Sequence, residues 1–451
     1  MRRLVFALLV CGCAPSSEIL LHVDTDALVP PAIPDDTRPP WLFDRVRLEV
    51  LRGGQPIDPP AARDFALTED LFRAGQVSIG IAATPGESDL SARVRLYRSG
   101  RIVAGEPRRS STLDTTVTLP SVGTSDRVDV TVRLHTDDVG LPKGPIAPDA
   151  GLPGPSQVST WPGAAIVPCH GQPGPDEVCV PGGAYWMGDP LLGNLGDGLD
   201  ADQERLVVLS PFFLDAREVT VADYRAVAAA LNEDKPPEHP DPGNSTSDLL
   251  TWCTWSTSPL DRELLPLNCT LHSTAVNYCG FKHKLVPTEA QLEFAASGRG
   301  RELGYVWGSD DPTCADAVFG RGGVGPFISI DPECLPNGSI GLPLPPGSTA
   351  RDRVRLPGAS QDVVDLAGNM AEWARDKWSR QDEAFWSQGG VFHDPVANVD
   401  SPADGGDLGT YATKGGYFQS LPLELRAGFR GFVNDNSVTV GSGFRCARDD
   451  H

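Results

Sequence analysis

The sequence predicts an α+β domain preceded by a small all-β sandwich domain, behind an export signal. Three observations support this. Segments that alternate apolar and polar residues fill the chain up to about residue 137, a stretch rich in Pro and Gly follows, and capped helices then mix with strands. The chain has 451 residues, of which 40% are hydrophobic and 22% charged, so it can form real cores and is not a disordered protein.

Residues 1–12 are predicted to be a signal peptide. Two arginines precede the apolar run Leu4 to Val10, which is too short to span a bilayer but long enough for a signal core. The following Cys11-Gly12-Cys13 resembles the end of a bacterial lipobox, in which Cys13 would become the lipidated N-terminus. Ala14, rather than Asp, comes next and implies transfer to the outer membrane. We expect an exported protein, lipid-anchored at the bacterial outer membrane; an ordinary cleaved signal with a chance Cys is the alternative.

Residues 13–137 are predicted to form the β-sandwich, with no hint of chemistry. The segments that alternate are Ile19–Val23, Val46–Val50, Val77–Ile81, Ala92–Tyr97 and Val128–Val132. They bring neither paired carboxylates nor a His cluster together, so a spacer or adhesion role is the simplest interpretation. Residues 138–168 are rich in Pro and Gly and are predicted to be a linker.

The charge balance argues against a nucleic-acid partner. Asp and Glu number 60 against 38 Lys and Arg, a net charge of −22. Binding phosphates needs clustered Lys and Arg, whereas an acidic surface suits solubility and divalent cations. We therefore expect no nucleic acid among the partners.

The cysteines predict disulfides. Of ten cysteines, Cys11 leaves with the signal and Cys13 is the lipid site, and an even number in an exported chain favours pairing. The spacings are not the CxxC pairs of a zinc site. The simplest assumption of local pairing joins Cys169 to Cys179, Cys253 to Cys269 and Cys314 to Cys334, leaving Cys279 for Cys446.

The second domain, residues 169–451, opens with strands and capped helices. Val180–Gly188 and Pro211–Thr220 are predicted strands, and Thr220 is expected to cap a helix that runs through Tyr224 and Val227. Ala275–Phe281 is predicted to be helical. Thr288 is a natural N-cap for a further helix, whose Leu292, Ala295 and Ala296 should face inward.

The stretch Asp365 to Asp376, DLAGNMAEWARD, has the features of an ion-binding turn. The step Gly368-Asn369 bends the backbone, so the Asn369 amide oxygen and the Glu372 carboxylate share one small space. That arrangement suits a hard cation. The alternative is a tight turn that buries one Trp under a capping carboxylate.

Seven motifs in order resemble the sulfatase-modifying-factor family, whose type member is the formylglycine-generating enzyme. They are VPGGAYWMG, FFLDAREVTVADY, LVPTEAQLEFAA, YVWG, DLAGNMAEWARD, TKGGYF and the terminal GFRCARD. The resemblance implies an irregular α+β fold related to the C-type lectins. It also supports a bond between Cys279 and Cys446, and it implies calcium held by Ala367, Gly368, Asn369, Met370 and Glu372.

The resemblance does not extend to the catalytic residues. The enzyme of this family oxidises a substrate cysteine to formylglycine, using two cysteines that hold copper, and Cu(I) needs such thiolates. The corresponding positions fall on Ser420 and Leu425, and the Ser of the family's KGGSY motif is Tyr417 here; the family's pocket residue before GFRC is Gly441. Copper is therefore not expected.

The sequence thus predicts a pseudoenzyme, a non-catalytic module that binds a protein or glycan ligand at the membrane surface. A formylglycine-generating-type oxidoreductase acting on a protein cysteine, or another chemistry in the same pocket, is the alternative. Ser420 lacks a nucleophile elbow and a recognisable base, so a surface hydroxyl in a loop is the simpler interpretation. Five histidines of the second domain are scattered without metal-binding spacing; they are His170, His239, His272, His283 and His393.

Overall fold

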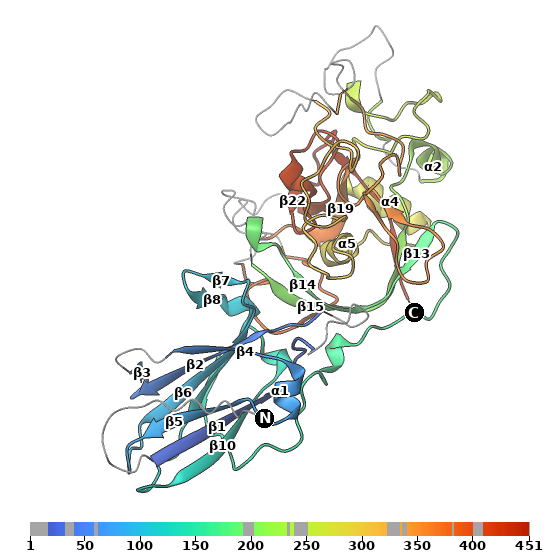
Figure 1. Ribbon diagram of the computed structural model, residues 1–451. Coiled ribbons are helices and arrows are strands. Elements are labelled where there is room, and N and C mark those ends of the chain that lie inside the picture. Colours follow the sequence, from blue (N-terminus) through green and yellow to red (C-terminus); the bar gives the residue numbers. More distant parts are fainter. Residues whose placement is uncertain are drawn as a thin grey trace. The chain divides into compact units, whose positions relative to one another are not determined.

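The computed structural model divides into two compact units, and each is described by itself (Figure 1). One unit extends to Ala165 and includes Gln388–Val391; the other comprises Ile166–Ser387 and Phe392–His451. The structure describes residues 17–31, 40–57, 62–192, 203–231, 235–238, 251–322, 334–335, 341–380, 383–399 and 409–450. The predicted signal peptide, the lipidation residue Cys13 and His239 lie outside these ranges.

The first unit is the all-β domain that the sequence predicts, and its described residues include one short α-helix, α1 (Glu69–Arg73). Its four-stranded sheet has the order β12-β10-β1-β5, and its six-stranded sheet the order β11-β9-β6-β2-β3 with β4 also on β2. Alternate residues of β1, such as Ile19 and Leu21, are fully buried. The strands are β1 (Ser17–Thr25), β2 (Arg45–Arg52), β3 (Gln55–Pro56), β4 (Arg63–Ala66), β5 (Ser78–Ala83), β6 (Leu90–Tyr97), β9 (Leu113–Thr118), β10 (Arg127–Leu134), β11 (Lys143–Ile146) and β12 (Asp149–Ala150), with the separate hairpin β7 (Ile102–Val103) and β8 (Glu106–Pro107).

The predicted linker, residues 138–168, is wrong for most of its length. β11 pairs in parallel with β9, and β12 pairs with β10, so this stretch adds a strand to the edge of each sheet. Trp161 is buried and donates through Nε1 to Asp137 Oδ1 at 2.8 Å. Edge strands tolerate Pro and Gly because one side of the strand makes no ladder hydrogen bonds, so composition alone did not reveal them.

The second unit contains little regular secondary structure, as expected of the predicted α+β fold. Its sheets are small, with the orders β13-β16-β24, β14-β15-β20, β17-β18 and β22-β21-β19-β23. The predicted strand Val180–Gly188 is divided, because Pro181-Gly182 separates two strands that belong to different sheets. The strands are β13 (Glu177–Val180), β14 (Gly183–Met187), β15 (Arg205–Leu209), β16 (Phe212–Asp215), β17 (Arg353–Val354), β18 (Val363–Val364), β19 (Ala371–Lys377), β20 (Phe392–His393), β21 (Thr410–Lys414), β22 (Gly431–Asn434), β23 (Ser442–Gly443) and β24 (Ala447–Asp449).

The helices of the second unit begin where the caps predict. Thr220 caps α2 (Val221–Arg225), and Thr288 caps α5 (Glu289–Ala296), each in a reciprocal capping box. The first helix is shorter than expected, since a separate helix, α3 (Ala228–Leu231), follows it. The other predicted helix is α4 (His272–Phe281). All eight residues of α5 are buried, which places the helix inside the unit.

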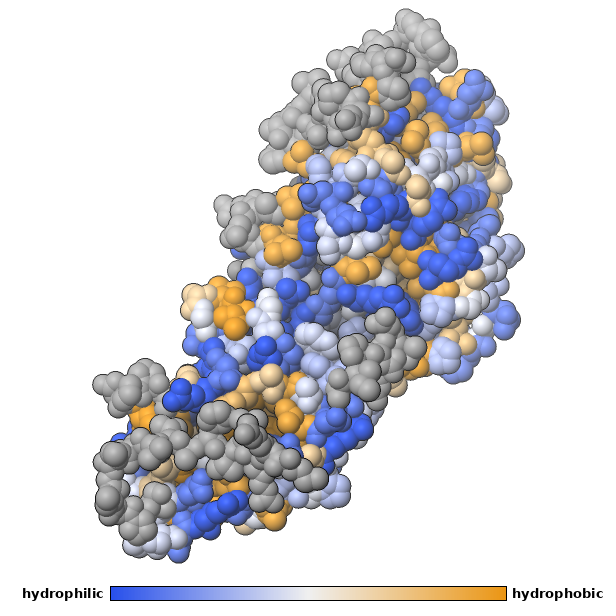
Figure 2. All heavy atoms as spheres, viewed as in Figure 1, coloured by the Kyte–Doolittle hydropathy of each residue, from blue (hydrophilic) through white to orange (hydrophobic). Residues whose placement is uncertain are grey.

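All four predicted disulfides are confirmed: Cys169–Cys179, Cys253–Cys269, Cys314–Cys334 and Cys279–Cys446. Four disulfides are typical of an exported protein. Within the described ranges, none of the helices is both long and apolar enough to cross a membrane. Figure 2 shows hydrophobic side chains interspersed with hydrophilic ones on the visible face of each unit.

Candidate functional site

The segment Asp365 to Asp376 makes a sharp turn and then enters a sheet. Asp365, Gly368 and Asn369 have positive φ angles of 54°, 127° and 61°. A Cβ on Gly368 would lie 2.6 Å from the Val318 carbonyl oxygen, so only glycine fits there. After the turn, β19 runs between β21 and β23 and buries Trp373 completely. The bend that the sequence predicts is therefore present, and β21 and β23 flank the strand that follows it.

Asn369 connects three parts of the chain through hydrogen bonds. Its Oδ1 accepts a hydrogen bond from Leu344 N–H at 2.9 Å, and its Nδ2 donates to Leu344 O at 3.0 Å and to Glu218 Oε2 at 2.6 Å. Its own carbonyl accepts from Phe418 N–H at 2.9 Å. Each Asn369 oxygen thus accepts one hydrogen bond, and its assignment as a calcium ligand stays a prediction.

Glu372 forms a fully buried ion pair with Arg445. Arg445 Nε donates to both carboxylate oxygens, at 2.7 and 2.8 Å, and Arg445 Nη2 lies 2.6 Å from Oε1. The guanidinium also donates to the carbonyls of Val364 and Asp365 at 2.7 and 2.9 Å. Arg445 therefore fastens the C-terminal segment to the start of the turn and to β19.

Three further carboxylates surround this ion pair. Glu218 accepts from Met370 N–H at 3.0 Å, and Asp352 accepts from Leu366 N–H at 3.0 Å. Asp365 lies close enough to act electrostatically on both, and Glu218, Asp352, Asp365 and Glu372 are each at most 3% exposed. Burial is the main cause that raises the pKa of each of the four.

The charges of this carboxylate cluster do not balance. Four carboxylates share the buried guanidinium of Arg445, and Arg353 also acts on Asp365, so full ionisation would leave two negative charges uncompensated. Unpaired charge is costly in a buried site, because the protein interior solvates ions poorly. The cluster must therefore take up protons or a cation.

Asp365 is the residue of the carboxylate cluster that has an oxygen free to bind a further group. Its Oδ2 accepts from Gly347 N–H at 2.5 Å, whereas its buried Oδ1 has no hydrogen-bond partner among the described residues. In the same residues, no three Asp, Glu, His or Cys side chains converge in a way that could hold a metal by themselves. A cation here would thus need main-chain carbonyls as well, which calcium accepts readily. Sequence reasoning missed Asp365; its position directly before the apolar step into the turn was the available signal.

A very small cavity lies beside the cluster. Its volume is about 10 Å³, and its lining includes Leu366, Glu372, Lys414 and Gly415. Such a space holds one water-sized particle at most. Lys414 is itself neutralised by Glu293 at 2.7 Å, with both side chains 4% exposed.

The two positions expected to correspond to the family's copper-binding cysteines lie in packed interior. Ser420 is 1% exposed and Leu425 0%, so the interpretation of Ser420 as a surface hydroxyl is wrong. Ser420 Oγ accepts from Tyr417 N–H at 2.9 Å, which closes the loop on itself. The ring of Tyr417 lies 2.8 Å from where a Cβ on Gly441 would be, so it fills the space that the glycine leaves open.

Comparison with known proteins assigns the family. The model of the sulfatase-modifying factor enzyme 1-like domain, named FGE-sulfatase, matches residues 164–450. The chain belongs to this family. A formylglycine-generating enzyme from Thermomonospora curvata is 26% identical over 320 residues, which covers 60% of this chain and 93% of that protein. A serine/threonine-protein kinase, Pkn1 of Chlamydia trachomatis, is 27% identical over 176 residues, 39% of this chain and 23% of the kinase.

Solved structures similar to this chain include PvdO from Pseudomonas aeruginosa. It is 19% identical with a TM-score of 0.40, covering 60% of this chain and 94% of that one. CarF is 17% identical with a TM-score of 0.37, and the match covers 61% of this chain and 98% of CarF.

The residues present do not fit the copper that the sulfatase-modifying-factor family implies. Ser420 offers a hydroxyl and Leu425 no donor at all, whereas Cu(I) prefers thiolates. Each of the eight cysteines in the described part of the chain is joined to another in a disulfide. The described histidines do not replace them: His272, for example, is buried against Tyr411 with ring centroids 3.5 Å apart.

Proposed function

We propose that the second unit is a non-catalytic member of the sulfatase-modifying-factor family that binds a protein or glycan ligand. The packing around Ser420 and Leu425 supports this most directly, because both side chains are buried and neither supplies a thiolate. The half-buried ring of Tyr417, seated on Gly441, occupies the place where the family pocket is expected. A ligand would then meet the domain at the surface of this filled region rather than enter it.

The test of this proposal is an activity assay with a matched positive control. The purified chain, loaded with Cu(I) under oxygen, is incubated with a peptide that carries one cysteine, and mass spectrometry follows conversion of the thiol to an aldehyde. We expect no product, whereas the Thermomonospora curvata enzyme should form it under the same conditions. Copper-dependent product from this chain would refute the proposal and favour the alternative, an oxidoreductase acting on a protein cysteine, which the similarity to that enzyme suggests.

Ligand binding is tested separately. Binding of the labelled chain to a glycan array and to a panel of purified outer-membrane proteins is compared with that of Tyr417→Ala. We expect a specific ligand whose binding weakens in this variant. A ligand whose affinity is unchanged would place the binding surface elsewhere.

We further propose that the carboxylate cluster binds a structural calcium ion. Its ligands would be the side chains of Asn369 and Glu372 with main-chain carbonyls from Ala367, Gly368 and Met370, and the Oδ1 of Asp365 would join them. The unpartnered Oδ1 of Asp365 and the excess negative charge support this. Ion binding to the native state alone stabilises by RT ln(1 + [L]/Kd), about 2.7 kcal/mol at 100 times Kd.

Asp365→Asn is the informative variant for the ion. Glu372→Ala would leave Arg445 buried without its carboxylate and destabilise the unit for that reason alone. We expect chelation to lower the melting temperature of the wild type, calcium to restore it, and Asp365→Asn to lose most of this response. Asn369→Ala should unfold more easily and should also lose part of this response, because its amide oxygen is one of the expected ligands. A wild-type melting curve that chelator leaves unchanged would exclude the ion.

Attachment to the outer membrane through Cys13 is also a proposal. It is supported by the lipobox-like sequence and by the disulfides typical of an exported protein. Stable attachment takes two or more acyl chains, because one anchors only marginally.

A further inference from the structure

Two buried arginines of the first unit face each other on adjacent strands. Arg47 of β2 and Arg95 of β6 are direct partners in the antiparallel register. Their side chains are only 10% and 5% exposed. Like charges directly opposite on a sheet destabilise it, and the cost grows with burial. Asp64 pairs with Arg47 and Glu49 with Arg95, and an anion between the two arginines lowers their mutual repulsion further.

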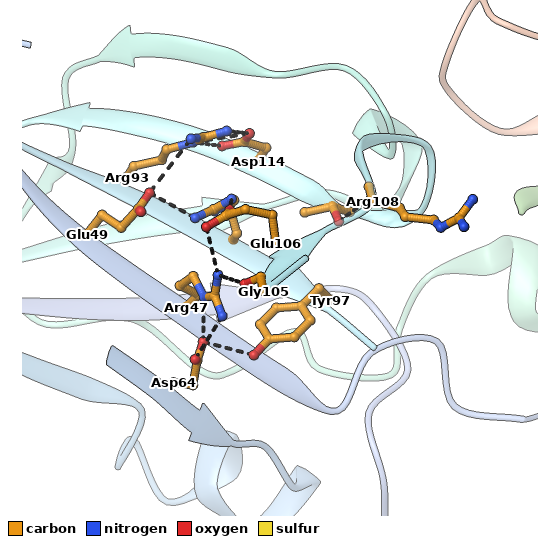
Figure 3. Close-up of polar contacts among 11 residues, drawn as sticks. Arg47, Glu49, Asp64, Arg93, Tyr97, Gly105, Glu106, Arg108 and Asp114 are labelled. Atoms are coloured by element: carbon orange, nitrogen blue, oxygen red, sulfur yellow. Dashed lines mark hydrogen bonds and ion pairs between the residues drawn. The ribbon is translucent and has the colours of Figure 1, made fainter. Parts of the chain in front are cut away.

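The anion is supplied by Glu106, which reaches in from the β7–β8 hairpin (Figure 3). Its Oε1 accepts from Arg47 Nη1 at 3.2 Å, and its Oε2 accepts from Arg95 Nη1 at 2.6 Å. The carbonyl of Gly105 accepts from the same Arg47 nitrogen at 2.8 Å. One carboxylate thus bridges two guanidinium groups, in the way that a protein binds a carboxylate ligand.

The two arginines are not equally satisfied. Arg47 makes two further hydrogen bonds to Asp64, which accepts from Nε and Nη2 at 2.7 and 3.0 Å. Arg95 Nη2 lies 2.9 Å from Glu49 Oε2 but lacks hydrogen-bond geometry, and Arg95 Nε has no partner among the described residues. The Arg95 side chain is buried, so its unused donors carry the cost of lost solvation. A carboxylate that also accepted hydrogen bonds from these donors of Arg95 would therefore be bound by more hydrogen bonds than the carboxylate of Glu106 is.

Glu106 is a replaceable occupant. Its side chain is 62% exposed, in contrast to the arginines beneath it. The hairpin that carries it has strands of two residues each, and its turn places Ala104 at a φ of 51°, which is unfavourable for a residue other than glycine. Ile102 and Val103 are 39% and 49% exposed, and Figure 2 shows a hydrophobic patch at this hairpin. Little packing thus holds the hairpin in place.

We propose that Arg47 and Arg95 form a recognition site for a carboxylate of an acidic peptide segment, and that Glu106 occupies this site until the partner displaces it. The partner's carboxylate would take the place between the guanidinium groups and the unused donors of Arg95. Clustered arginines are a recurrent means of recognising acidic segments. Because the tethered Glu106 competes at high effective concentration, the apparent affinity is lowered by the fraction of molecules in which the site is open.

The test measures fluorescence anisotropy of a labelled tetraglutamate peptide with the full chain. Glu106→Gln removes the competing charge and should lower the apparent Kd about tenfold or more relative to the wild type. Glu87→Gln is the matched control, because Glu87 also pairs with an arginine of β2, Arg52, but that arginine is 56% exposed. It should leave the Kd within about twofold. Adding Arg95→Gln to Glu106→Gln should abolish the gain.

Two further measurements keep the test decisive. Inorganic phosphate should compete with the peptide more weakly than succinate does, since the site is shaped by a carboxylate; the reverse order would overturn the assignment of the ligand. Hydrogen exchange of the wild type should show faster exchange at the β7–β8 hairpin when the peptide is bound. No peptide binding to either the wild type or Glu106→Gln, or binding that Arg95→Gln leaves intact, would refute the proposal.

Discussion

Removing the disulfide between Cys279 and Cys446 should cost the second unit more stability than removing any local disulfide. The bond joins residues 167 positions apart, whereas Cys169–Cys179 spans 10. In the chain-entropy model the loop lengths correspond to about 5 kcal/mol and about 2.7 kcal/mol of free energy of unfolding. Cys279 and Cys446 are also both 0% exposed, so their truncation adds a packing loss in the same direction.

The comparison is between the double variants Cys279→Ala/Cys446→Ala and Cys169→Ala/Cys179→Ala. Urea unfolding followed by tryptophan fluorescence reports mainly on the second unit, since seven of the nine tryptophans lie there. We expect the first variant to lose about 2 kcal/mol more than the second. If the two variants lost the same free energy, or the local pair cost more, loop entropy would not be the basis of this disulfide's contribution.

Three other predictions concern a histidine, a buried ion pair and the anchor. Burial lowers the pKa of His272 to about 4; the unfolded chain therefore binds more protons between pH 6.5 and 4, and the free energy of unfolding should fall by on the order of 3 kcal/mol as the pH drops through that window. His272→Phe should remove this part of the pH dependence in parallel urea titrations, and an unchanged slope would contradict it. Glu289→Ala should cost about 3–5 kcal/mol because the charge of Arg430, 1% exposed, loses its carboxylate; thermal melts should show a smaller loss for Glu289→Ala combined with Arg430→Met. Cys13→Ala should move the chain from the membrane fraction to the soluble one, and full retention in membranes would exclude the lipid anchor.

Local sequence determined the elements whose stabilising interactions are close in the chain. Thr220 and Thr288 cap their helices through residues three positions away, so the hydroxyl and its partner were visible together. The alternation in β1, β2, β6 and β10 reported which residues face a core, because side chains of a strand point to opposite sides in turn. The step Gly368-Asn369 likewise predicted the bend from adjacent residues, whereas the contact with Val318 O that leaves no room for a Cβ was seen only in the structure.

The tertiary structure decided what local pattern leaves open. Asn369 and Glu372 are close in sequence, but Asn369 hydrogen-bonds to Leu344 and Glu218, whereas Glu372 pairs with Arg445. The sequence around the turn does not predict these distant partners. Asp352 and Glu218 join Asp365 only because segments far apart in the chain pack together. The opposed pair of Arg47 and Arg95 likewise depends on the register between β2 and β6. Two residues 48 positions apart in the chain do not specify that register. Hydrogen bonds and charges act over a few ångströms in space, so chemistry assembled from distant segments becomes visible only once the chain is folded.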